Sequence, residues 1–185
     1  MKILLSVVVT IIVLVLAGMI ISLRYYDVSA MNPDGRLNKW FFTKVKDNSI
    51  KRNAANITIP SLGDSIQVGL GFMHFDEMCV TCHGAPGIDR SESGEGLNPM
   101  APDLTRSVKN MSDAELYWVI KNGIKMTGMP SFGKTHSEEQ LWAIVSFVRL
   151  LPNMTPEQYQ FFAKVHQNMD MEGMDMDKEE HHQEE

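Results

Sequence analysis

The hydrophobic positions of the chain form one unbroken run, followed by several segments with helical spacing. Residues Ile3 to Leu23 are almost entirely apolar, and a run of about 20 such residues is long enough to cross a bilayer as one helix. Further along, apolar residues recur every three or four positions over Ser65–Met78, Asp113–Lys121 and Glu138–Leu151, which is the spacing of one face of an α-helix. The pattern predicts an all-α protein with an N-terminal transmembrane helix.

Polar residues mark where several of these helices begin. In a capping box a Ser or Thr is followed three positions later by Glu or Gln, and three such pairs precede predicted helices: Ser112 with Glu115, Ser137 with Gln140, and Thr155 with Gln158. The last pair predicts a short helix over residues 156–167. Gly71 lies inside the helix over residues 65–78, where glycine costs about 1 kcal/mol relative to alanine. We therefore expect a close crossing at Gly71 with the helix over residues 138–151, with Phe147 lying over the glycine.

The N-terminal run has two interpretations. A secretory signal peptide would be cleaved after a small residue such as Ala17, but its apolar region usually spans roughly 7–15 residues. The run here is longer, which favours a retained single-pass anchor over residues 1–24. Both interpretations predict that the rest of the chain is exported.

Charge is distributed unevenly over the rest of the chain. The net charge of −6 at pH 7, without a basic excess, argues against nucleic-acid binding. Residues 24–56 carry seven basic and three acidic residues. Apolar side chains in this basic stretch fall near helical spacing: Leu37, Trp40, Phe41 and Val45. The stretch either lies on anionic lipid headgroups or packs on the folded domain or on a partner subunit.

The C-terminal residues form an acidic tail. Residues 169–185 are rich in Met, His and acidic residues and contain no Phe, Trp or Tyr, a composition that predicts disorder. Because Met and His are donors suited to copper, copper binding by this tail is the alternative. The predicted organisation is an anchor (1–24), a basic linker (25–64), a helical domain (65–152), a short helix (153–168) and the tail (169–185).

The strongest chemical signal in the chain is Cys79-Val80-Thr81-Cys82-His83. The C-x-x-C-H spacing lets two thiols add to the two vinyl groups of one haem while the adjacent imidazole reaches the iron. A thioredoxin-like redox pair would need a βαβ setting, and no strand pattern surrounds the motif. A zinc site would need a second Cys/His pair at short spacing, and the chain has no other cysteine.

A Gly-Met-Pro turn offers a further ligand. In Gly128-Met129-Pro130 the glycine and proline would fix the backbone so that the Met129 thioether points inward. Met126 is the rival, but its neighbours are less turn-forming, which favours Met129. The Gly-, Ser- and Glu-rich segment over residues 87–100 is expected to be a plain surface loop, and His74 a surface histidine.

Several of these motifs, in this order, resemble a class I c-type cytochrome: Cys79-Val80-Thr81-Cys82-His83-Gly84, the Gly71/Phe75 helix, Ala101-Pro102-Asp103-Leu104 and Gly128-Met129-Pro130. The resemblance covers roughly residues 65–152 and is strongest to small membrane-anchored cytochromes with an oxidase-subunit-III-like (cbb3-type) haem domain. It implies a class I cytochrome c fold around one covalently bound haem c. The implied roles are thioether bonds for Cys79 and Cys82, the proximal iron ligand for His83, the distal ligand for Met129, and for Pro102 a carbonyl that accepts a hydrogen bond from the ligating imidazole.

The resemblance also implies a function. We expect a membrane-tethered monohaem cytochrome that carries single electrons between redox protein partners of a respiratory chain, rather than an enzyme. Its place would be the bacterial inner membrane, with the haem domain facing the periplasm. Three alternatives stay open: a fixed haem-relay subunit of a larger oxidase or dehydrogenase, a haem sensor or enzyme whose methionine dissociates from the iron, and a copper-handling protein that acts through the tail.

Overall fold

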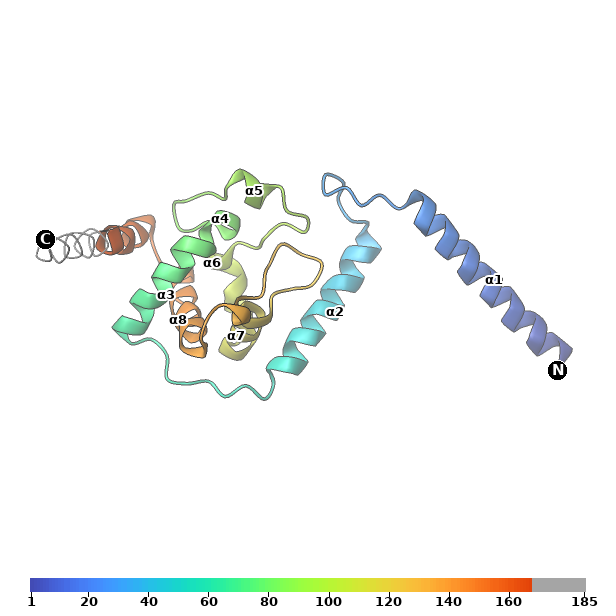
Figure 1. The fold of residues 1–185 in the computed structure, drawn as a ribbon, viewed down its shortest axis with the longest axis horizontal. Helices are drawn as coiled ribbons and strands as arrows, with labels where there is room; N and C mark the ends of the chain where they lie inside the picture. Colours follow the sequence, from blue (N-terminus) through green and yellow to red (C-terminus); the bar gives the residue numbers. More distant parts are fainter. Residues whose placement is uncertain (168–185) are drawn as a thin grey trace, which may run out of the picture. The chain divides into compact units, whose positions relative to one another are not determined.

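The computed structural model describes residues 1–167, and every regular element in this part of the chain is a helix (Figure 1). An isolated bridge between Ala85 and Ile88 is the only strand-like pairing among these residues. The all-α class predicted from the sequence is therefore confirmed. Residue 168 and the tail over residues 169–185, with its predicted disorder and its alternative of copper binding, lie outside the described residues.

The chain divides into two units, Met1–Pro33 and a second unit that begins at Asp34, and each is described by itself. The first unit contains α1, Lys2–Tyr25, whose side chains are exposed along its whole length. At 1.5 Å per residue its 24 residues give a helix of about 36 Å. The Thr10 hydroxyl donates to the Ser6 carbonyl at 2.9 Å, so this polar group is satisfied within the helix. Helix α1 is long and apolar enough to cross a membrane.

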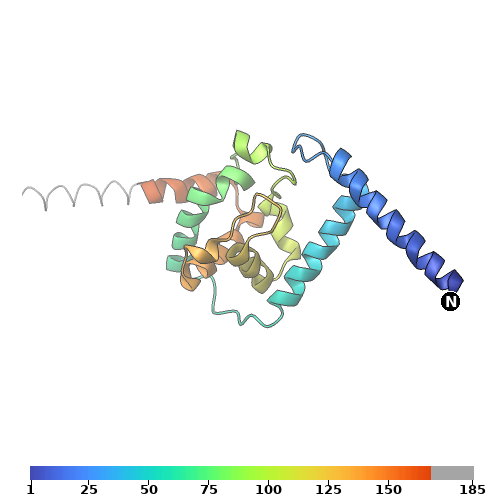
Figure 2. The same cartoon turned by 45° about the vertical axis from the view of Figure 1, so that its right-hand side comes forward.

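The second unit contains the other helices. Its α-helices are α2 (Arg36–Ala54), α3 (Ser65–Met78), α4 (Val80–His83), α5 (Glu92–Glu95), α6 (Leu104–Ser107), α7 (Asp113–Asn122) and α8 (Glu138–Val148). Short 3-10 turns are η1 (Val108–Asn110), η2 (Phe132–Lys134) and η3 (Leu151–Asn153), and residues 156–167 form a last helix. Helix α3 packs on α8, α8 on α7, and α7 on α2 (Figures 1 and 2).

The core is organised around the crossing of α3 and α8. Gly71 faces the backbone of α8: a Cβ atom built on it would lie 1.9 Å from the Ala143 carbonyl oxygen and 3.0 Å from Phe147 Cβ. Only a residue without a side chain allows this approach. The close crossing predicted at Gly71, with Phe147 over it, is therefore confirmed.

Aromatic rings fill the space beside this crossing. The ring of Phe72 lies 5.3 Å from that of Phe147 and 5.4 Å from those of Tyr159 and Phe162, measured between centroids. Tyr159 is fully buried, and its hydroxyl donates to Asp76 at 2.6 Å. Burial, together with Asp76, raises the pKa of Tyr159, so the hydroxyl keeps its proton. Because Tyr159 and Phe162 belong to the last helix, that helix packs back onto α3.

The helix starts lie where the capping boxes predict them. Each box shows both reciprocal hydrogen bonds between the Ser or Thr and the Glu or Gln three positions later: Ser112 with Glu115, Ser137 with Gln140, and Thr155 with Gln158. Helix α8, however, ends at Val148 rather than at the predicted Leu151. The chain tightens into a 3-10 turn there, with Leu150 N–H donating to the Phe147 carbonyl at 2.9 Å. Pro152 has no N–H to donate to the Val148 carbonyl four residues earlier, and its ring would clash with that carbonyl in an α-helix, which accounts for the end of α8 at Val148.

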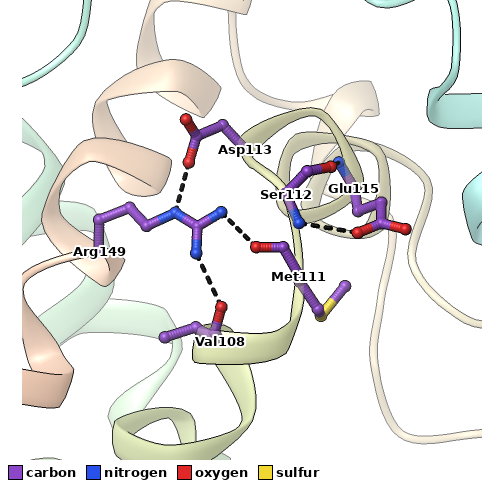
Figure 3. A network of polar contacts seen from close by, with 6 residues as sticks. All are labelled: Val108, Met111, Ser112, Asp113, Glu115 and Arg149. Atoms are coloured by element: carbon purple, nitrogen blue, oxygen red, sulfur yellow. Dashed lines mark hydrogen bonds and ion pairs between the residues drawn. The ribbon is translucent and has the colours of Figure 1, made fainter.

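Arg149, directly after α8, ties together three segments of the domain (Figure 3). Its guanidinium donates to the carbonyl oxygens of Val108 at 2.7 Å and Met111 at 2.6 Å, and it pairs with the carboxylate of Asp113. Val108 lies in η1, and Asp113 is the first residue of α7. A planar guanidinium that satisfies three acceptors at once holds η1 and the start of α7 in place beside the end of α8.

Candidate functional site

The C-x-x-C-H motif occupies the turn that ends α3 and forms α4. Cys79 N–H donates to the Phe75 carbonyl at 2.9 Å, and the Cys79 carbonyl accepts from His83 N–H at 2.9 Å. Because Cys82 and His83 follow Cys79 by three and four residues in helical geometry, the three side chains share one face of the turn. Both cysteines are free thiols. Two covalent bonds to one planar cofactor require two thiols on the same face, and this turn provides them.

His83 is held in one orientation by a backbone carbonyl. Its Nδ1 lies 2.8 Å from the carbonyl oxygen of Pro102. A carbonyl only accepts hydrogen bonds, so Nδ1 carries the proton and donates, which leaves the lone pair of Nε2 available to a metal. Burial lowers the pKa of His83, Arg90 adds to this shift and the bond to Pro102 opposes it, so the imidazole is neutral at pH 7. Histidine ligates a metal in this neutral form.

Asp103 fixes the backbone that presents this carbonyl. Its carboxylate caps α6 by accepting hydrogen bonds from the Thr105 N–H at 2.9 Å and the Thr105 hydroxyl at 2.6 Å. The hydroxyl bond, foremost, lowers the pKa of Asp103, so the capping group stays charged at neutral pH. Leu104, the next residue, packs against the core. The motif Ala101-Pro102-Asp103-Leu104 therefore combines a carbonyl aimed at His83 with a cap and an apolar anchor that hold it there.

The protonation of Cys79 argues against a redox pair. Burial, with Cys82 adding to the effect, raises the pKa of the Cys79 thiol to about 12. Thiols that exchange disulfides have lowered pKa values instead, because the thiolate is the nucleophile. Within residues 1–167, no three His, Cys, Asp or Glu side chains gather where they could hold a metal ion. That part of the chain thus supports neither the thioredoxin-like nor the zinc interpretation of the motif.

Met129 and Met126 belong to one loop but have different environments. Met129 is partly buried and packs against the hydrophobic core, whereas Met126 is 89% exposed and has a φ of +62°. The loop closes through a hydrogen bond from Ile124 N–H to the Met129 carbonyl at 3.1 Å. Met129 N–H in turn donates to the Thr127 hydroxyl at 3.1 Å. Of the two thioethers, Met129 is the one that the loop places against the domain.

The segment over residues 87–100 packs against the cysteine motif. The hydroxyl and the N–H of Ser91 both donate to the Thr81 carbonyl, at 2.9 and 3.0 Å. A Cβ atom on the buried Gly94 would lie 2.6 Å from the same carbonyl oxygen and 3.0 Å from Cys82 Cα. The small side chain of Ser91 and the absence of one at Gly94 allow this segment to lie directly against the backbone of Thr81 and Cys82.

The same segment also reaches the methionine loop. A Cβ atom on Gly128, the residue before Met129, would lie 2.5 Å from Cδ2 of Leu97. The plain surface loop expected for residues 87–100 is therefore only partly right: most of its residues are exposed, but the segment contains α5 and contacts both parts of the candidate site. Its composition does not distinguish small residues needed for packing from small residues in a solvated loop.

Arg90 is a site residue that the sequence did not single out. A cavity of about 390 Å³ borders His83, and Arg90 and Asp103 are among the residues that line it. Arg90 Nη1 donates to Met100 Sδ at 3.2 Å, while the buried Nε has no hydrogen-bond partner within the described residues. A buried guanidinium N–H calls for an acceptor such as a carboxylate. The available signal was that Arg90 is the only basic residue between His83 and Met100.

Taken together, these residues fit a haem. The two free thiols and the neutral imidazole come from one helical turn, and the Met129 thioether comes from a separate loop. Cys79 and Met129 border the same hydrophobic core, so sulfur and nitrogen donors are available beside an apolar volume. The buried Nε–H of Arg90, which has no hydrogen-bond partner within the described residues, could donate to the carboxylate of a haem propionate.

His74 lies on α3, five residues before Cys79. Its ring packs against that of His136, with centroids 5.1 Å apart and an interplanar angle of 79°. Burial, and then His136, lower the pKa of His74, while Glu77 opposes the shift. Its Nε2 is buried. The surface position expected for His74 is therefore only partly right, because the residues that precede α8 cover one side of the ring.

Comparison with known protein families gives a match. Residues 67–148 match the family model described as cytochrome C oxidase, cbb3-type, subunit III. The match begins within α3 and ends at Val148, the last residue of α8. It therefore includes all the candidate site residues: Cys79, Cys82, His83, Arg90, Pro102 and Met129. No curated protein matches the chain.

Proposed function

Because residues 67–148 match the family model described as cytochrome C oxidase, cbb3-type, subunit III, we propose that this chain is a membrane-tethered monohaem c-type cytochrome that carries electrons. It would carry single electrons between redox proteins of a respiratory chain, on the periplasmic side of a bacterial inner membrane. The observation that carries the proposal is the 2.8 Å distance between His83 Nδ1 and the Pro102 carbonyl oxygen. His83 is the residue that directly follows Cys82, the second of the two free cysteines.

Each residue of the candidate site would have a separate role in binding the haem. Haem c, when bound, supplies the one-electron chemistry of its iron. Cys79 and Cys82 would hold it covalently, and His83 would ligate the iron through Nε2. The Pro102 carbonyl keeps the imidazole oriented and strengthens it as a donor.

Met129 decides between an electron carrier and a haem enzyme or sensor. If the Met129 thioether ligated the iron of a bound haem, it would leave no iron site for a substrate or a gas, and as a soft, weak donor it would raise the reduction potential. Met129 packs against the core, and its carbonyl accepts the hydrogen bond from Ile124 N–H that closes the loop. Both contacts restrain Met129 and support its role as an iron ligand that does not dissociate.

Helix α1 supports the tether. All its side chains are exposed in a helix long enough to span a bilayer. An anchor of this kind keeps a haem domain near membrane-bound donors and acceptors at high effective concentration.

The haem assignment is tested on the full chain, expressed in a bacterium with the cytochrome c maturation system and extracted from its membranes. We expect one haem per chain, still attached after denaturing electrophoresis. The double variant Cys79→Ala/Cys82→Ala should lose the attached haem, whereas Met126→Ala should keep it. A wild-type chain that is exported and colourless would overturn the assignment.

The tether and its orientation are tested separately. We expect the mature chain to keep the mass of the uncleaved polypeptide and to resist extraction by alkaline carbonate. Protease added to spheroplasts should digest the haem domain. On native gels of mildly solubilised membranes, a free carrier runs as the lone chain. Constant co-migration with an oxidase or dehydrogenase would instead indicate a fixed relay subunit.

A further inference from the structure

Helix α2 carries an apolar stripe that the cytochrome domain leaves uncovered. Leu37, Phe41 and Val45 follow one another at intervals of four residues, and their exposed fractions are 74%, 52% and 49%. Side chains four residues apart lie on one face of a helix. The stripe therefore presents three large apolar side chains to the surroundings along the N-terminal half of α2.

The packed face of α2 lies on the opposite side of the helix. Ile50 and Ala54 are its buried residues, and α2 packs on α7. Phe41 precedes Ile50 by nine residues, and Val45 precedes Ala54 by nine. Nine residues are about two and a half turns at 3.6 residues per turn, so each pair is on opposite sides of the helix. The contact with α7 thus turns the stripe away from the domain.

The charge of α2 indicates what covers the stripe. The helix has six basic residues and one acid, Asp47. The basic residues are distributed along the whole helix: Arg36, Lys39, Lys44, Lys46, Lys51 and Arg52. The centre of a protein–protein interface is usually depleted of charged residues. Long basic side chains around an apolar stripe instead match a bilayer with anionic headgroups, because their stems lie on the lipid while their ammonium groups bind phosphate.

The course of the chain brings a bilayer within reach. Helix α1 ends at Tyr25 and α2 begins at Arg36, so the connection is the segment 26–35. Ten residues span at most about 35 Å when fully extended. If α1 crosses the membrane, as the proposed function requires, α2 starts within that distance of the headgroups.

We propose that the N-terminal half of α2 is a second membrane contact, in which Leu37, Phe41 and Val45 enter the headgroup boundary of an anionic bilayer. The inference rests on the α1 anchor of the proposed function but not on the haem ligands. Because α2 packs on α7, this contact would set the orientation of the cytochrome domain over the membrane.

The test uses the haem-loaded full chain in nanodiscs and a tryptophan reporter. Trp40→Phe removes the native reporter from α2 and provides the background signal of Trp118 and Trp142. On this background, Phe41→Trp places a reporter in the stripe, and Thr43→Trp places a matched, exposed reporter on the other side of the helix. Each variant is measured in discs of equal parts phosphatidylcholine and phosphatidylglycerol, with and without bromine on the acyl chains, which quenches tryptophan at close range.

We expect brominated lipid to reduce the emission of the Phe41→Trp reporter about twofold and that of the Thr43→Trp reporter much less. Discs without phosphatidylglycerol, or high salt, should weaken the quenching at position 41 because they remove or screen the anionic partner. If the chain stays with the disc but neither reporter is quenched, or both are quenched equally, the second contact is refuted while the anchor stands. A chain that does not stay with the disc refutes the anchor, and this inference with it.

Discussion

The carbonyl oxygen of Ala143 lies only 1.9 Å from the ideal position of a Cβ atom on Gly71. No side chain fits in that space, so α3 and α8 are in backbone contact at this point. The turn that carries Cys79, Cys82 and His83 follows directly from α3. The position of this candidate haem-binding turn therefore depends on a contact made two helical turns earlier.

Gly71→Ala should destabilise the domain strongly. The added methyl group forces α3 and α8 apart, and we expect a loss of about 3 kcal/mol in the free energy of unfolding, measured by urea denaturation. Gly69→Ala is the matched control on the same helix, because nothing lies within 4 Å of a Cβ atom there. That variant should be neutral or more stable by up to about 1 kcal/mol. Equal effects of the two substitutions would show that the crossing is not close.

Met129→Ala should change the redox properties of the protein. Loss of the thioether is expected to lower the reduction potential by on the order of 0.1 V and to let carbon monoxide bind the reduced form. Potentiometric titration and carbon monoxide difference spectra measure the two effects. Met126→Ala, at a position that is 89% exposed, should leave both unchanged. The reverse outcome would transfer the ligand role to Met126.

Arg149→Lys should loosen the network in Figure 3. Lysine cannot donate in one plane to Val108, Met111 and Asp113 together. We expect a loss of about 2 kcal/mol in unfolding free energy, less than for a fully buried pair because the Arg149 side chain is 28% exposed. Arg106→Lys, whose pair with Asp103 is at the surface with an arginine 88% exposed, should cost less than about 0.5 kcal/mol. Thermal unfolding of both variants provides the comparison.

The His74–His136 contact predicts a dependence of stability on pH. Burial, and then His136, hold the pKa of His74 below 6.5, with Glu77 opposing. The unfolded chain therefore binds a proton at His74 more readily than the folded chain does. The contribution of neutral His74 to the free energy of unfolding is therefore fully present above pH 6.5, and it is lost as the pH falls from there through the pKa of His74 in the folded protein.

Because the His74 ring is only partly buried, solvent screening should keep the effect below about 1 kcal/mol. Urea denaturation between pH 7.5 and 5 measures it, and we expect the His74→Gln variant to have a flatter profile than wild type. Parallel profiles would remove His74 as the source.

Local features of this protein could be predicted from its sequence. A capping box depends on two residues three positions apart, so the box of Ser112 and Glu115 can be recognised without knowing what packs against it. The shared face of Cys79 and His83 follows in the same way from helical spacing. Glycine inside a helix needs a reason, and Gly71 could therefore be connected with α8 before any contact was known.

The tertiary structure decided which distant residues meet. Nothing in the composition of residues 87–100 shows that Gly94 lies against Thr81 or that Leu97 lies against Gly128. The partners of Arg149, the buried Nε of Arg90 and the contact of His74 with His136 are likewise unmarked in the sequence. These contacts depend on how the helices pack, and many sequences with the same local pattern could pack differently. Periodicity and caps specify elements over three or four residues, whereas the burial of a particular side chain is specified only when the whole domain has closed around it.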